Sequence, residues 1–176
     1  MIRRMLEAIK LKSSIYEEVE ADKSATPQAL LVVVLASLAS GIALIGMPDQ
    51  NTGDQSPVVL IIGTVVLALL VWALLAMIAY LVGTKLFPTS ETSADWGELA
   101  RTLGFAQSVG ILKIFGLLPV IGSTVFAIVS IWTLVATVIA IRQALDYTST
   151  LRAVLVTIVS YIPTILLLYL IVNLIS

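Results

Sequence analysis

The sequence predicts an all-α integral membrane protein with five transmembrane helices, preceded by a short amphipathic cytoplasmic extension. Composition is the first reason, because 59% of the 176 residues are hydrophobic, 12% are charged and the mean hydropathy is +1.07. A soluble domain of this size cannot bury so much apolar surface, whereas a bilayer accepts it as solvent. The second reason is that prolines and short polar stretches divide the chain into long apolar runs. We therefore expect amphipathic helices over 1–27 and one membrane domain over 28–176.

The N-terminal extension is expected to contain two short helices. The first carries an apolar stripe at helical spacing, made of Ile2, Met5, Leu6 and Ile9. This helix suits a membrane interface, with Arg3 and Arg4 near anionic head groups, or equally a position packed on the inner face of the protein. Ser14 and Glu17 form a capping box, which predicts the second helix over about 15–21.

Five apolar segments follow the extension, bounded by prolines, glycines or polar clusters. They are expected at about 28–46, 57–87, 97–118, 122–145 and 151–175. As a helix the second would be about 46 Å long, more than the ~30 Å of hydrocarbon, so it must tilt, bend near Gly63 or Gly83, or extend beyond the membrane. The third, at about 33 Å, is just long enough to cross, and its charges and glycines leave a re-entrant or broken helix as the alternative. The connector at 48–56 contains aspartates and no Lys or Arg.

The distribution of Lys and Arg predicts the orientation. With five crossings, nine of the ten lie on one side of the membrane and only Lys113 lies on the other. The positive-inside rule then places the N-terminus in the cytoplasm and the C-terminus outside. The same count favours five crossings, because omitting the third segment would place Arg142 and Arg152 on the outer face.

Histidine and cysteine are both absent from the chain. Their absence excludes Cys nucleophiles, His general bases, zinc sites built on His or Cys, and haem with His or Cys axial ligands. The sequence also lacks a nucleotide-binding loop and the HExxH and GxSxG motifs. A membrane surface explains the N-terminal cations better than nucleic acid does. We expect no catalytic activity, no cofactor, no metal and no nucleic-acid partner.

Two sets of polar residues are candidates for a functional site. The inner-face polar cluster consists of Glu98, Arg101, Arg142, Asp146 and Arg152. Glu98 and Arg101 stand three residues apart, so they can meet on one helix. Arg142 and Asp146 stand four apart and can meet on another. All five lie near helix ends, where long side chains reach water at little cost, so anchoring and topology setting are the alternative to a docking or ligand surface.

Gln107 and Lys113 are the candidate intramembrane polar residues. On a straight α-helix Gln107 lies about 240° and Lys113 about 120° from Arg101, so the three point in different directions. This counts against a transport path along the helix unless its glycines break it. A lone amide in a membrane more commonly forms a hydrogen bond across helices.

Three stretches carry a resemblance to a known family. They are IYEEVEADKSATPQALLVV, WGELARTLGFAQ and IWTLVATVIAIRQALDYTSTLRAV. Together they resemble the Yip domain family, in its prokaryotic branch, over nearly the whole chain, and the third stretch is the most specific. The resemblance implies a five-helix integral membrane protein with a cytoplasmic N-terminus, here in the plasma membrane of a prokaryote. Relatives often carry a proline just after LGFA, where this chain has Gln107 to Gly110, so a break there is expected to be less sharp.

Eukaryotic members of that family look like partners of Ypt/Rab GTPases in vesicle traffic and membrane shaping, whereas the resemblance carries over no activity for bacterial members. The function that we expect is a non-enzymatic scaffold, adaptor or membrane organiser that acts through its cytoplasmic face. Its partners would be the lipid bilayer, a cytosolic protein or further copies of the chain. Small-residue faces on the first and fourth membrane helices favour a homo-oligomer. The alternative is a small-solute or ion transporter or channel that uses the polar, glycine-rich third helix.

Overall fold

A computed structural model describes residues 1–46, 56–118 and 120–175, and these residues form helices and connecting turns without any strand. In chain order the elements are α1 (Ile2–Ile9), α2 (Ser13–Ala21), η1 (Lys23–Ala25), α3 (Thr26–Gly46), α4 (Pro57–Leu81), η2 (Val82–Leu86), α5 (Trp96–Ala106), η3 (Gln107–Leu117), α6 (Gly122–Ala144) and α7 (Thr150–Ile175). η2 is a π-helical turn, whereas η1 and η3 are 3₁₀ helices. The acidic connector expected over 48–56 lies, except for Ser56, outside the described residues.

Four helical stretches are long and apolar enough to cross a membrane. They are Lys23–Gly46, Pro57–Leu86, Gly122–Ala144 and Thr150–Ile171. These four correspond to the first, second, fourth and fifth predicted segments, and the third is not among them. The all-helical fold is confirmed, and the four helices are consistent with a multi-pass membrane protein. A helix is the expected form because every backbone N–H and C=O in hydrocarbon must find its hydrogen bond inside the protein.

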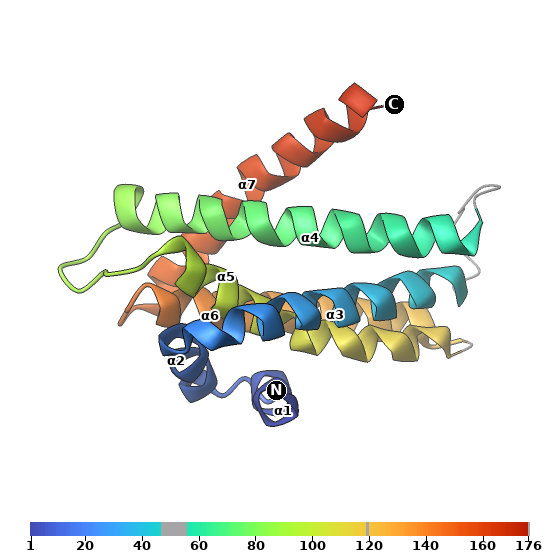
Figure 1. The fold of residues 1–176 in the computed structure, drawn as a ribbon, viewed down its shortest axis with the longest axis horizontal. Coiled ribbons are helices and arrows are strands. Elements are labelled where there is room, and N and C mark those ends of the chain that lie inside the picture. Colours follow the sequence, from blue (N-terminus) through green and yellow to red (C-terminus); the bar gives the residue numbers. More distant parts are fainter. Residues whose placement is uncertain (47–55, 119, 176) are drawn as a thin grey trace.

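α3, α4 and α6 run roughly along the long axis of the bundle, whereas the C-terminal part of α7 leaves it at an angle (Figure 1). α3 packs on η3, α4 and α5, and α6 packs on η3, α5 and α7. Their small-residue faces are used inside this bundle: Ala36 of α3 is 5% exposed, and Ala136 and Ala140 of α6 are fully buried. These faces are therefore occupied within one chain and do not by themselves favour a homo-oligomer.

The third predicted segment changes helix type at its middle. α5 ends at Ala106, and η3 continues as a 3₁₀ helix, an unusually long run for this conformation. Glycines let it approach α3, since a Cβ on Gly104 would lie 2.7 Å from the Cβ of Ala29, and one on Gly110 would lie 3.2 Å from that of Ala36. At about 2.0 Å per 3₁₀ residue and about 1.5 Å per α-helical residue, the segment reaches about 38 Å, longer than the straight α-helix that we expected.

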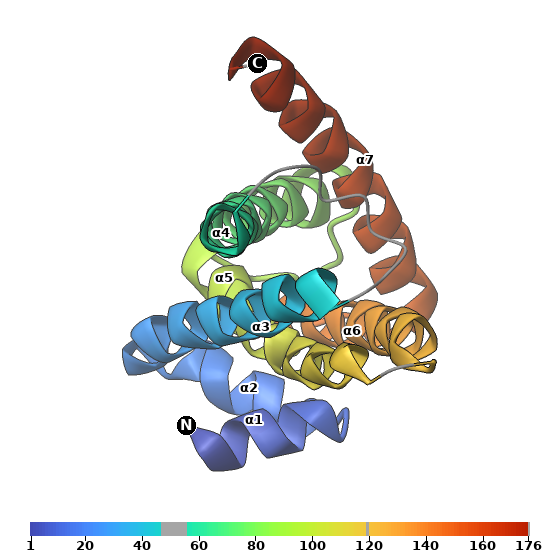
Figure 2. The same cartoon turned by 90° about the vertical axis from the view of Figure 1, so that its right-hand side faces the viewer.

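The N-terminal extension packs on the bundle. α2 lies against α5 and α6, and its Ile15, Tyr16 and Val19 are fully buried. α1 lies across the bundle, seen end-on in Figure 1 and lengthwise in Figure 2, and it contacts η3, α5 and α2. Its apolar stripe is divided, because Met5 and Ile9 pack toward the core whereas Ile2 and Leu6 are exposed. We expected α1 either in the membrane interface or on the inner face of the protein. The structure shows that the side of α1 with Met5 and Ile9 packs on the protein.

Candidate functional site

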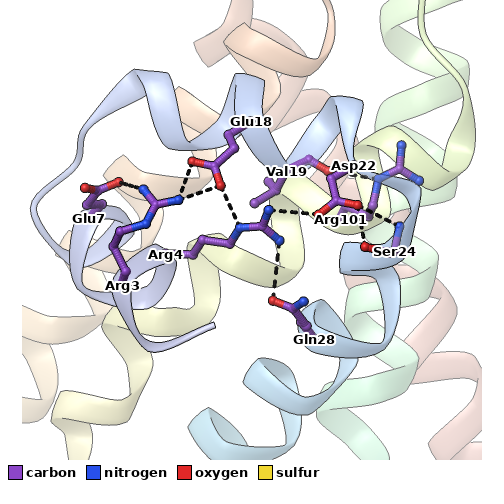
Figure 3. Close-up of polar contacts among 9 residues, drawn as sticks. All are labelled: Arg3, Arg4, Glu7, Glu18, Val19, Asp22, Ser24, Gln28 and Arg101. Carbon is purple, nitrogen blue, oxygen red and sulfur yellow. Dashed lines mark hydrogen bonds and ion pairs between the residues drawn. The ribbon is translucent and has the colours of Figure 1, made fainter.

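Arg101 fastens the N-terminal extension to the third segment. Its side chain is buried, and its guanidinium donates hydrogen bonds to the carbonyl oxygens of Val19 (3.0 Å) and Glu20 (2.5 Å). Figure 3 draws Arg101 together with Val19. Those carbonyls belong to the last turn of α2, where the helix leaves its acceptors without internal partners. A cation at this end also complements the negative pole of the helix dipole.

Ion pairs join α1 to α2 and to the start of the first membrane helix. Arg3 contacts Glu7 at 2.9 Å and Glu18 at 2.6 Å. Arg4 contacts Glu18 at 2.8 Å and Asp22 at 2.8 Å (Figure 3). The hydrogen bond from Arg3, followed by that from Arg4, lowers the pKa of the Glu18 carboxyl. The two arginines that we expected near anionic head groups therefore lie on carboxylates of the protein itself.

Glu98 does not form the expected ion pair with Arg101. It belongs to a capping box at the start of α5, in which the Asp95 carboxylate accepts from the Glu98 N–H (2.8 Å). In return the Glu98 carboxylate accepts from the Asp95 N–H (2.7 Å). Both residues thus satisfy N–H groups that an isolated helix start would leave unpaired.

Arg142 and Asp146 do not form an ion pair either, because α6 ends at Ala144 and the four-residue helical spacing is lost. Asp146 adopts a left-handed conformation, with φ of 52°, and its side chain is exposed. Arg142 instead donates to the carbonyl oxygens of Tyr147 (3.1 Å) and Thr148 (3.3 Å). It therefore stabilises the turn between α6 and α7.

Tyr147 and Arg152 connect that turn to the end of the second membrane helix. The Tyr147 hydroxyl lies 3.0 Å from the carbonyl oxygen of Gly83 and 2.7 Å from that of Phe87, and it donates to this pair. Arg152 lies over the Tyr147 ring at 5.8 Å and donates to the carbonyl oxygen of Pro88 at 3.4 Å. Our sequence reasoning missed Tyr147, although it lies inside the stretch that carries the most specific family resemblance.

Four carboxylates gather near the same end of the bundle, and we call this set the acidic face. It consists of Glu17, Glu20, Glu98 and Asp146. They come from α2, α5 and the α6–α7 turn, and the Glu17 carboxylate also accepts from the Gln143 amide at 2.6 Å. Among the described residues no group of His, Cys, Asp and Glu is arranged to hold a metal ion. Glu17 and Glu20 were not predicted, although their spacing of three residues places them on one side of α2.

The carboxyl of Glu20 is the most perturbed member of the acidic face. Burial, followed by the charges of Asp146 and Glu98, raises its pKa from 4.5 to about 7, while Arg101 acts in the opposite direction. The folded protein therefore holds this proton more tightly than the unfolded chain does. The stability that this proton provides is present below pH 4.5 and is lost as the pH rises through 7.

Replacing Glu20 with glutamine is therefore expected to stabilise the protein at pH 8 and to have little effect at pH 4.5. We expect a gain of roughly 1–2 kcal/mol at pH 8, discounted because the group is half exposed. Thermal unfolding in detergent at both pH values would check this. Equal effects of Glu20→Gln at the two pH values would contradict it.

Gln107 and Lys113, the candidate intramembrane residues, line one cavity. A 3₁₀ helix has three residues per turn, so positions 107, 110 and 113 share a face of η3. That face borders a cavity of about 220 Å³ between α3, α4 and η3, which we call the membrane cavity. The prediction that the side chains of Gln107 and Lys113 diverge is therefore wrong, because it assumed that the α-helix continues from Gln107 to Lys113.

Most hydroxyl and indole donors around the membrane cavity are already used. Ser37, Ser40 and Thr64 each donate to a backbone carbonyl of their own helix. The indole of Trp72 donates to the carbonyl oxygen of Ala100 at 2.9 Å. The Lys113 ammonium lies 4.6 Å from the centre of the Phe126 ring. Within the described part of the chain, neither the Gln107 amide nor the Lys113 ammonium has a hydrogen-bond or ion-pair partner.

Comparison with known proteins supports the resemblance noted above. A family model described as the Yip1 domain matches residues 11–171. The match takes in every element from α2 to most of α7 and leaves α1 outside. No curated protein and no solved structure matches the chain.

Proposed function

Because the chain belongs to the Yip1 domain family, whose members are non-enzymatic membrane proteins, we propose that it is a membrane scaffold that holds a cytosolic protein on its acidic face. The observation that carries this proposal is that the face is assembled in advance. Arg101 and the buried residues of α2 fix Glu17 and Glu20 beside carboxylates of other elements. A surface that needs no ordering on binding loses less entropy when a partner docks.

The topology that we propose puts the acidic face in the cytoplasm. α5 and η3 together run along the bundle in the same general direction as α3 and α6 (Figure 1), and their length of about 38 Å exceeds that of the hydrocarbon. With this fifth crossing, nine of the ten cations fall on the side of the N-terminus. The positive-inside rule supports a cytoplasmic N-terminus and an outer C-terminus, in a prokaryotic plasma membrane.

The partner that fits this face is a basic protein segment. Four neighbouring carboxylates repel the anionic head groups of the inner leaflet. The same four negative charges favour a partner whose binding surface is rich in cations. The Arg101 guanidinium, which acts on Glu20, is buried and occupied by backbone carbonyls. A lysine-rich or arginine-rich segment would replace the repulsion among the carboxylates with attraction.

Carbodiimide crosslinking in native membranes tests the proposal, because this reagent joins a carboxylate to a partner's lysine without a spacer. We expect an adduct that disappears in the triple variant Glu17→Gln, Glu20→Gln and Asp146→Asn. Glu98 is left intact because it caps α5. Glu91→Gln, at an exposed position in the connector before α5, is the matched control and should retain the adduct. An unchanged set of adducts in the triple variant would remove the acidic face as a docking site, and an adduct of two copies would identify the partner as the chain itself.

A transporter remains the second candidate, and the alignment of Gln107 with Lys113 on η3 favours it. The membrane cavity places a partly buried charge among the helices. A transporter would move a small anion into liposomes faster than protein-free vesicles do, and Lys113→Leu would abolish the difference. Equal rates with and without protein would remove this candidate.

A further inference from the structure

An apolar groove along α4 lies next to the membrane cavity. This groove has a volume of about 640 Å³ and lies between α4, Leu44 of α3, and Leu168 and Ile171 of α7. Thr64 and Leu67 line both the membrane cavity and the groove. A pocket with two polar side chains, Gln107 and Lys113, and an apolar groove thus lie on neighbouring sides of one helix, an arrangement that suits an amphiphile.

The polar end of this site is formed by Gln107 and by Lys113, whose ammonium lies over the ring of Phe126, a residue of α6 outside the cavity lining. The ammonium of Lys113 carries three donors and the amide of Gln107 carries two. The surrounding hydroxyls have given their protons to backbone carbonyls and can only accept. A charged side chain inside the bilayer normally has a partner. The chemistry therefore suits an anion with oxygen acceptors.

Packing contacts place Lys113 beneath the outer end of the bundle rather than at its middle. Gly110 lies against Ala36, and Gly41, one turn further along α3, lies against Thr64. Three residues beyond Gly110, at about 2.0 Å each, Lys113 is therefore at the level of Ser40 and Thr64. An amphiphile entering from the outer leaflet would reach this depth with its head group while its chain stayed in the groove.

Size restricts the head group. At about 220 Å³ the membrane cavity is smaller than the ~300–1,000 Å³ of a typical small-molecule site, so it suits a compact head group. A carboxylate with its first methylene groups fits. The larger groove then accommodates the remaining chain, and Gly63 keeps it open, because no atom lies within 4 Å of a Cβ placed there.

We propose that the membrane cavity binds a long-chain fatty acid, with its carboxylate on Lys113 and Gln107 and its chain in the groove along α4. This site is separate from the acidic face and does not depend on the scaffold function. Binding would neutralise Lys113 and fill the space that α7 leaves beside the outer half of α4. The fatty acid would thus act as a structural ligand of the outer half of the bundle.

Quenching of Trp72 by a long-chain fatty acid brominated close to its carboxyl end tests the proposal, because this tryptophan forms part of the cavity wall. The full-length protein, carrying Trp96→Phe and Trp132→Phe so that Trp72 alone fluoresces, would be placed in zwitterionic nanodiscs. We expect saturable quenching by the acid and none beyond simple partitioning by its methyl ester. Lys113→Leu should weaken binding about 10- to 100-fold, the worth of hydrogen bonds to a charged group. Lys113→Arg should retain binding.

Two further variants keep the test decisive. Gly63→Leu fills the groove without touching the polar end, and it should reduce binding while Lys113 is intact. Lys85→Leu removes a cation exposed at the opposite end of the bundle and should bind as the unmodified protein does. Equal quenching by acid and ester, or unchanged binding in Lys113→Leu, would overturn the proposal. Saturable quenching by brominated phosphatidylglycerol without any by the acid would replace the fatty acid with a phospholipid and would equally refute it.

Discussion

Replacing Arg101 with methionine is expected to release the N-terminal extension and to destabilise the protein by about 2–4 kcal/mol, because two charge-assisted hydrogen bonds are lost. Methionine retains much of the length of the side chain but leaves the carbonyls of Val19 and Glu20 unsatisfied beside a buried surface. The acidic face would loosen as well, since α2 carries two of its carboxylates. Thermal unfolding and limited proteolysis of residues 1–25, both in detergent, would measure the two effects.

Two matched variants separate this prediction from a general loss of charge. Arg101→Lys should restore part of the stability, because an ammonium satisfies one carbonyl well but cannot span both as the planar guanidinium does. Arg152→Met should cost less than about 1 kcal/mol, as expected for an exposed interaction, since its hydrogen bond to the carbonyl oxygen of Pro88 is 3.4 Å long. If Arg101→Met left the unfolding temperature and the proteolytic pattern unchanged, the hydrogen bonds of Arg101 would not be what holds the N-terminal extension on the bundle.

The membrane helices could be predicted from the sequence because the bilayer makes the problem local. Each apolar segment must satisfy its own backbone, so prolines and polar clusters define the helices to within one or two residues. The second predicted segment, 57–87, is α4 with η2 and ends at Leu86, and the fourth, 122–145, is α6 and ends at Ala144. The family resemblance followed from the same stretches, and the match over residues 11–171 confirms it.

The polar contacts could not be predicted because they join residues far apart in the chain. Arg101 is 82 residues from Val19, so no local spacing rule could pair them. The expected pair of Arg142 with Asp146 assumed that the helix continued, whereas α6 stops before Asp146. The expected divergence of Gln107 from Lys113 was wrong because it assumed an α-helix, whereas η3 has three residues per turn. One signal was present: Gly104, Gly110 and Gly116 recur every six residues, which equals two 3₁₀ turns.

The second large effect is expected at Gly104, where α5 meets α3. A Cβ there would lie 2.7 Å from the Cβ of Ala29 and 3.1 Å from its carbonyl oxygen, and backbone atoms cannot move aside cheaply. Gly104→Ala should therefore cost about 1–3 kcal/mol through overpacking, and Gly104→Leu more, as α3 is pushed off the third segment.

Gly63→Ala provides the matched comparison, because it makes the same chemical change inside α4, facing open space. Alanine there should stabilise the protein by about 0.5–1 kcal/mol, since it favours the helix and meets no neighbour. Thermal unfolding of both variants in one detergent would compare the two sites directly. We expect glycine-to-alanine to destabilise the protein at position 104 and to stabilise it at position 63, because only Gly104 lies against Ala29 of α3. Equal changes in stability in the two variants would refute this close approach of α5 to α3.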